Sequence, residues 1–186
     1  MAFIAQLWIP ILASAVLVFV ASSLIHMVFK WHNPDFRKLA NEDEVRAVLR
    51  AGGSAPGEYM IPHCGDMKDM KNPQFVKKFE EGPVGMLTLR PNGAPKMGGA
   101  LGMWFVYTLV ISGIAAYVAS KTLIGEVNFL QVCRVVSALA FLAYAGGSVQ
   151  AGIWMGKPWG SVAKDLLDGA IYAAITAMTF AWWWPR

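Results

Sequence analysis

Four long apolar stretches constrain the fold of this chain more than any other feature. They cover about residues 3–29, 101–119, 129–154 and 166–184, and most charged residues lie between the first and the second stretch. A helix of about 20 apolar residues crosses the ~30 Å hydrocarbon core of a bilayer. The sequence therefore predicts an all-α integral membrane protein with four transmembrane helices. A polar insert with short helices is expected over residues 30–100.

The composition agrees with a membrane protein. The chain has 186 residues, of which 56% are hydrophobic and 15% charged, whereas soluble domains average about 45–50% and about 25%. The first stretch has no basic segment before it and is too long for the apolar part of a signal peptide. We therefore interpret it as a retained anchor and residues 1–186 as a single membrane domain.

Basic residues predict how the chain is oriented. Lys30, Arg37 and Lys38 follow the first stretch, and Lys157 and Lys164 lie just before the fourth. Because Lys and Arg collect in cytoplasmic loops, we expect the insert inside the cell and both termini outside. The net charge of +4 fits contact with anionic lipid better than contact with nucleic acid.

The insert carries start and stop signals for two short helices. Asn41 with Glu44 resembles a capping box before a helix that stops at Gly52, and Asn72 before Pro73 starts a second helix that ends at Gly82. The glycine-rich stretch between them is predicted to be a loop. It lacks the pattern of a phosphate-binding loop.

Between those helices, "MIPHCGDMKDM" (residues 60–70) gathers sulfur and imidazole groups. His63, Cys64, Met67 and Met70 are the candidate metal ligands, because thiolate and thioether groups select Cu(I). A helix from Pro62 would place the cysteine and both methionines along one side. The same spacing also suits an amphipathic helix that packs on apolar surface. Packing is the favoured interpretation, so no cofactor is expected and Cu(I) is the alternative.

Polar residues within the predicted spans are candidates for function: His26, Arg134, Gln150 and Asp168. His26 is the single histidine expected inside a span, since His32 and His63 fall within the insert. We expect Asp168 to pair with Lys164, four residues earlier on the same helix face. None of these ionisable groups lies at mid-membrane, which argues against a proton-coupled transporter.

Small residues recur at every fourth position in the last two stretches: Ala143, Gly147 and Ala151, then Gly169, Ala173 and Ala177. Such stripes mark faces where helices in lipid pack closely. Hydrolase and nucleotide-binding motifs are missing from the sequence. We therefore expect a protein that is not an enzyme and that works through protein contacts, as a homo-oligomer or as an accessory subunit of a membrane complex. The alternatives are a cytoplasmic-face protein that handles Cu(I) or another soft metal, and a small oligomeric pore or carrier.

The stretch "GIWMGKPWGSVAKDLLDGAIYA" (residues 152–173), together with "LIHMVFKWHNPDF" after the first span, resembles small bacterial inner-membrane proteins with no assigned activity. The resemblance implies a bacterial inner membrane as the setting. It implies no functional residues.

Overall fold

The computed structural model describes residues 2–185 and confirms the all-α class, with 71% of the chain helical. Its long helices are α1 (Ala2–Ser23), α4 (Met97–Thr122), α5 (Phe129–Trp154) and α6 (Trp159–Trp182). A π-helical turn, η1 (Leu24–Phe29), continues α1, and a 3-10 turn, η2 (Asn33–Asp35), follows it. The shorter elements are α2 (Glu42–Ala51), β1 (Gly57–Ile61), the 3-10 turn η3 (Met67–Lys71), α3 (Pro73–Glu81) and β2 (Gly85–Leu89).

The chain divides into two compact units. The helical unit contains the chain up to Asp35, from Lys96 to Gly152, and from Lys157 onward. The insert unit contains Phe36–Pro95 and Ile153–Gly156. The helical unit therefore reaches six residues beyond the predicted start of the insert at residue 30.

Three of the described helices are long and apolar enough to cross a membrane: Ile4–Phe29, Met97–Thr122 and Phe129–Trp154. Their length and composition indicate a membrane protein. The fourth helix, α6, is not among them, because Lys164, Asp165 and Asp168 in its first half lower its hydropathy. It also begins earlier than predicted, directly after Pro158 rather than at residue 166.

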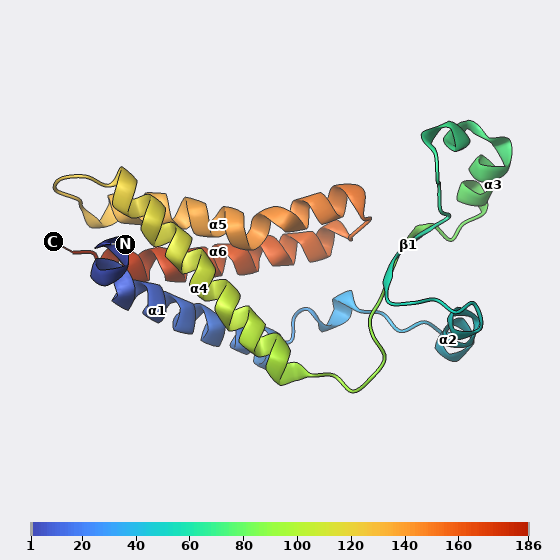
Figure 1. Ribbon diagram of the computed structural model, residues 1–186, viewed down its shortest axis with the longest axis horizontal. Helices are drawn as coiled ribbons and strands as arrows, with labels where there is room; N and C mark the ends of the chain where they lie inside the picture. Colours follow the sequence, from blue (N-terminus) through green and yellow to red (C-terminus); the bar gives the residue numbers. More distant parts are fainter. Residues whose placement is uncertain (1, 186) are drawn as a thin grey trace. The chain divides into compact units, whose positions relative to one another are not determined.

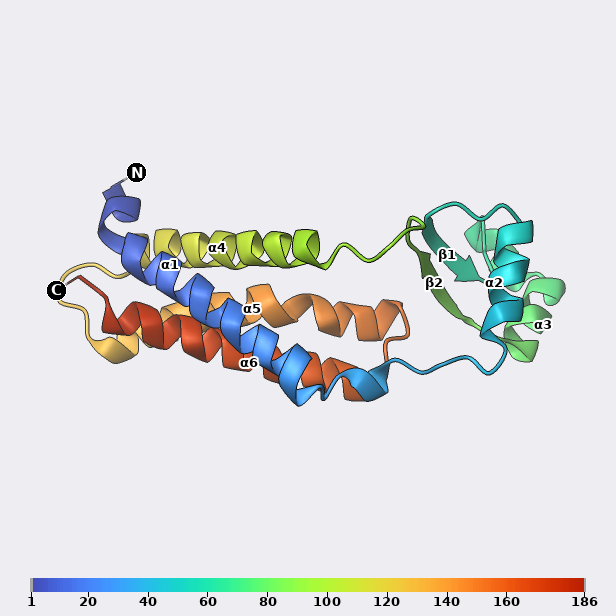
Figure 2. The same ribbon diagram turned by 90° about the horizontal axis from the view of Figure 1, so that it is seen from below.

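The four long helices run alternately in opposite directions, so that α1 and α5 point one way and α4 and α6 the other (Figures 1 and 2). Helix α1 packs against both α4 and α6. Within the α1–α4 contact, the hydroxyl groups of Ser14 and Ser112 share a buried hydrogen bond of 2.9 Å. The core consists of two apolar clusters. One joins Leu7, Ala115, Ala119, Val132, Val136, Ala177 and Phe180, and the other joins Val18, Ile25 and Tyr172.

The stripe of small residues on α6 is buried, as its pattern predicts for a packing face. Gly169, Ala173 and Ala177 all lie in the core. A Cβ atom added at Gly169 would lie 2.6 Å from the Cβ of Ala145 on α5, so the two helices pack too closely here for a side chain at this position. The stripe on α5 lies elsewhere: Ala143 and Gly147 are exposed, and Ala145 is the residue that meets α6.

In the insert unit, β1 and β2 form an antiparallel pair in which Gly57 lies opposite Leu89 and Ile61 opposite Gly85. The predicted helices over the two capped segments are present as α2 and α3, and the Asn72 side chain accepts a hydrogen bond from the Gln74 amide at 2.9 Å. Asn41 makes no side-chain cap.

Two predictions for the insert hold only in part. The glycine-rich segment is a loop as far as Pro56 and then enters strand β1. The helix considered from Pro62 is only the short 3-10 turn η3. The chain leaves β1 at Ile61, and Asp66 then caps a new turn by accepting the Lys68 amide at 2.9 Å. The strand that ends at Ile61 and the cap at Asp66 therefore prevent a continuous helix over this stretch.

Candidate metal centre

The end of α1 folds back on itself within the helical unit. After the π-helical turn η1, Lys30 adopts a left-handed conformation with φ 53°, and its amide donates to the Ile25 carbonyl at 3.0 Å. A left-handed residue of this kind reverses the chain at the end of a helix. The reversal brings His32 back beside His26, and their rings stack at 4.9 Å between centroids with an angle of 11°.

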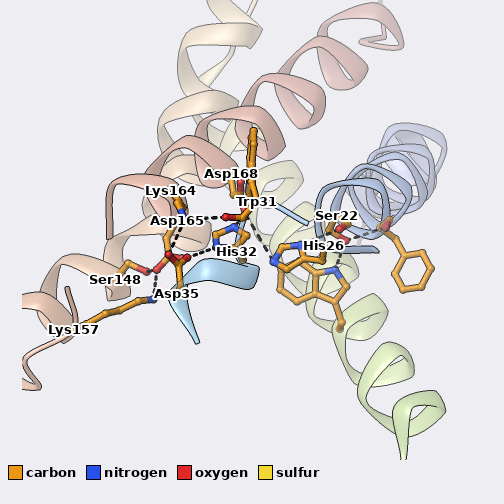
Figure 3. A network of polar contacts seen from close by, with 12 residues as sticks. Ser22, His26, Trp31, His32, Asp35, Ser148, Lys157, Lys164, Asp165 and Asp168 are labelled. Carbon is orange, nitrogen blue, oxygen red and sulfur yellow. Dashed lines mark hydrogen bonds and ion pairs between the residues drawn. The ribbon is translucent and has the colours of Figure 1, made fainter. Parts of the chain in front are cut away.

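Both histidines face one carboxylate (Figure 3). The Nε2 atom of His32 lies 2.8 Å from Oδ2 of Asp168, and the Nε2 atom of His26 lies 3.9 Å from the same oxygen. Asp168 reaches this point from α6. One potential ligand atom from each of the three residues lies within 4.8 Å of the other two.

Oxygen atoms hold the opposite nitrogen of each imidazole ring. His26 Nδ1 lies 2.9 Å from the Ser22 carbonyl oxygen, and His32 Nδ1 lies 3.1 Å from Oδ2 of Asp35. A carbonyl oxygen only accepts, so Nδ1 of His26 carries a proton, and in the neutral ring Nε2 keeps the free lone pair. Metal-bound histidines are oriented in this way, by an oxygen acceptor on the nitrogen remote from the metal.

Asp35 is itself held in place by Lys164. The Lys164 ammonium donates to Oδ1 of Asp35 at 2.7 Å and to the Trp31 carbonyl at 2.8 Å. This hydrogen bond from Lys164, helped by the one from His32 and opposed by partial desolvation, lowers the pKa of Asp35 from its ordinary value. Asp35 therefore remains a carboxylate next to the His32 ring.

The cluster is buried on one side and open on the other. Asp168 is 5% exposed, and its Oδ1 atom has no hydrogen-bond partner among the described residues. The side chain of His32 is 13% exposed, whereas that of His26 is 52% exposed. A buried carboxylate oxygen without a partner is costly, so a group that bonds to this oxygen would stabilise the cluster.

A cavity of about 360 Å³ adjoins the cluster on the side of α4 and α5. His26, Asp168 and Tyr172 line it together with a second carboxylate, Asp165. Asp165 already has partners, since it accepts from the Ser148 hydroxyl and from the Lys157 ammonium.

Two of the four polar residues predicted within the spans, His26 and Asp168, therefore meet in one site. The predicted pairing of Asp168 with Lys164 is wrong. Lys164 reaches Asp35, and Asp168 turns toward the histidines. Arg134 and Gln150 are exposed on α5, outside the cluster.

His32 is absent from the predicted site residues because it falls within the predicted insert. The signal that could have found it is the Asn33-Pro34-Asp35 turn, since Asn-Pro dipeptides mark turns. That turn closes the helical unit at Asp35.

The candidate copper ligands belong to the insert unit, whereas this cluster belongs to the helical unit. His63, Met67 and Met70 are exposed, and the Cys64 thiol donates to the Asp66 carbonyl at 3.0 Å. Met70 lines an apolar groove with Phe75, Val76 and Phe79 of α3. Copper binding by these residues stays a prediction.

We compared the chain with protein-family models, with curated proteins and with solved structures, and none of them matches it.

Proposed function

We propose that this protein spans a bacterial inner membrane four times and binds a divalent transition-metal ion at its cytoplasmic side, through His26, His32 and Asp168. The observation that carries the proposal is the convergence of two Nε2 atoms on one carboxylate oxygen, while both Nδ1 atoms are held by oxygen acceptors.

The distances suit a metal ion after a small adjustment. Nitrogen and oxygen ligands lie about 2.0–2.2 Å from a zinc ion, which places two ligands of a tetrahedral site roughly 3.4 Å apart. Oδ2 of Asp168 is now 2.8 Å from one Nε2 atom and 3.9 Å from the other. Each distance therefore changes by only about 0.5 Å. The stacked His26 ring must also tilt, and its exposed position allows it to do so.

The donor set favours some ions over others. Two imidazoles and one carboxylate suit Zn²⁺, Fe²⁺ and neighbouring first-row ions, and they leave coordination positions open. These ligands are harder than the thioethers and thiol of residues 63–70. The proposed centre and the predicted Cu(I) site thus differ in their metal as well as in their place in the chain.

The membrane arrangement in this proposal uses α6 as the fourth span. Its 24 residues correspond to about 36 Å of helix at 1.5 Å per residue. Its charged residues lie at the end where α1 and α5 finish, and partners in the bundle pair with all three of them. An ionisable residue in a membrane helix is tolerated when it faces the bundle interior and has a partner.

Metal titration of the purified protein in nanodiscs tests the proposal. We expect one Zn²⁺ per chain, and we expect His32→Ala and Asp168→Asn each to weaken binding at least ~100-fold, since even outer partners of metal ligands are worth 10–100-fold. The matched control is His63→Ala, an exposed histidine of the insert, which should bind zinc like the unchanged protein. Equal zinc affinity in all four proteins would refute the assignment.

The Cu(I) prediction is tested separately under reducing conditions. Cys64→Ser and Met67→Ala should lower the copper content while leaving zinc binding unchanged. Equal copper contents in the variants and the unchanged protein would end that hypothesis.

A second candidate function, association through α5, rests on its uncovered face. Ala143 and Gly147 are exposed, a Cβ atom at Gly147 would meet nothing within 4 Å, and Gln150 is exposed on the same helix. Small residues and amides of this kind join helices in lipid. The face could pack against a second copy or against another membrane subunit.

Mass measurement in mild detergent tests the association. We expect a homo-oligomer that Gly147→Leu converts to monomer, whereas Val110→Phe, at an exposed position of α4, leaves it intact. A monomer before any substitution would contradict self-association.

A further inference from the structure

Two residues that line the cavity beside the metal centre carry buried polar groups without a partner. Oδ1 of Asp168 and the hydroxyl group of Tyr172 have no hydrogen-bond partner among the described residues, and both residues line the cavity. A hydroxyl group can serve both, because it donates to the carboxylate and also accepts from a phenol.

The charges around the cavity argue against an anionic head group. Two carboxylates line it, Asp165 and Asp168. The nearby lysines are already paired, Lys157 with Asp165 and Lys164 with Asp35. A phosphate or a fatty-acid carboxylate would therefore meet negative charge without a free cation, and a neutral hydroxylated group fits better.

The walls favour a flat ring. Trp104, Tyr144 and Tyr172 lie against one another with ring centroids 5.4–6.2 Å apart. Aromatic side chains at such spacings accept a further ring edge-on or offset. Pockets of roughly 300–1,000 Å³ hold small organic ligands, so a cavity of about 360 Å³ suits a single substituted ring.

The cavity continues into an apolar groove on α1. The two spaces share Ser23 and Met27, and the groove is further lined by Phe19, Val20, Leu24 and Val28. Met27 and Met97 at the cavity are each about 60% exposed. Because this part of α1 belongs to a candidate span, the groove opens toward lipid and can hold a hydrocarbon tail.

We propose that the cavity and groove together bind a lipid-soluble phenol or quinol, with its hydroxylated ring beside Asp168 and Tyr172 and its tail along α1. Binding uses groups that are present without a metal ion. The inference therefore goes beyond metal binding and does not depend on it.

Binding of a decyl-substituted benzoquinol tests the proposal, measured in nanodiscs treated with chelator and kept reduced, against empty nanodiscs. We expect saturable binding at one site per chain. The oxidised quinone should bind at least ~10-fold more weakly, because it has no O–H group that can donate a hydrogen bond to the unpartnered Oδ1 of Asp168. Tyr172→Phe, which keeps the ring and removes the hydroxyl, should weaken quinol binding several-fold.

A groove variant supplies the second measurement. Val20→Trp should fill the groove and lower quinol affinity at least ~10-fold, and Val106→Trp, at an exposed position of α4, should not. Unchanged helical circular dichroism and elution volume in both variants establish that they fold.

Three results would overturn the proposal: no saturable binding above that of empty nanodiscs, equal binding to Val20→Trp, or binding of dodecyltrimethylammonium with none of the quinol. The last result would identify a site for lipophilic cations. Zinc titration without quinol is a separate measurement, so a failure of metal binding and a failure of quinol binding are distinguished.

Discussion

At the scale of single residues, the site depends on how the proton positions of two imidazoles are fixed. Asp35 accepts from His32 while Lys164 holds the Asp35 carboxylate from the other side. Oδ2 of Asp168 lies 2.8 Å from the remaining nitrogen of His32. The ring thus lies between two carboxylates, and a metal ion that replaces its Nε2 proton meets a ligand already oriented by Asp35.

Asp35→Asn should reveal this orienting role. The amide keeps the size of the side chain and loses the charge that pairs with Lys164, so we expect zinc affinity to fall about 10–100-fold, the range typical of outer partners of metal ligands. Metal titration measures the change. Asp43→Asn, at an exposed carboxylate of the insert that pairs with Arg46, is the control. A loss of less than twofold would show that Asp35 does not orient His32 for the metal.

Part of this site could be predicted from residue types alone. His26 and Asp168 stood out as polar residues in apolar stretches. Their meeting with His32 could not be foreseen, because residues six positions apart lie about 240° around a regular α-helix. Only the π-helical turn and the left-handed Lys30 place the two rings together, and no simple sequence pattern marks either. The predicted Asp168–Lys164 pairing was wrong because the folded-back segment supplies other partners: His32 for Asp168 and Asp35 for Lys164.

At the scale of elements, α5 and α6 pack closely because α6 has a glycine where they meet. Among the described glycines, this one would have the shortest contact if a Cβ atom were added. A Cβ atom at Gly169 would lie 2.6 Å from Cβ of Ala145 and 3.3 Å from its Cα. Spacing by fours predicted that α6 would pack through this stripe. The spacing could not show which face of α5 packs against this stripe, because α5 is apolar around most of its circumference and carries small residues on more than one side.

Gly169→Ala should therefore destabilise the protein by about 1–3 kcal/mol, the usual cost of overpacking a core. Adding Ala145→Gly should recover part of this loss, because it removes the atom that clashes, and a coupling of about 0.5–3 kcal/mol is expected for residues in contact. Thermal unfolding in detergent, followed by circular dichroism, measures both. Gly146→Ala is the control, since its Cβ would meet nothing within 4 Å. Additive effects of the two substitutions would contradict the contact.

At the scale of the whole molecule, the division into two units separates the two metal hypotheses. The proposed centre lies entirely in the helical unit, and the methionine-rich stretch lies entirely in the insert unit. Hydropathy predicted three of the spans well. The mean hydropathy of α6 is too low for a span because the first half of the helix carries charged residues. These residues have partners in the bundle, but an average over a window cannot distinguish a paired charge from an exposed one.

The number of spans determines on which side of the membrane the C-terminus lies. If α6 crosses the membrane, the C-terminus lies on the same side as the N-terminus and opposite Cys64; if it does not, the C-terminus lies on the side of Cys64. We expect the first outcome, because both ends of the described chain lie at the same end of the helical unit (Figure 1). In a Cys133→Ser background, a membrane-impermeant maleimide added to intact spheroplasts should label a cysteine appended after Arg186 and should not label Cys64. Inverted vesicles should give the reverse pattern. Labelling of both cysteines from the cytoplasmic side alone would leave α6 on that side and remove the fourth span.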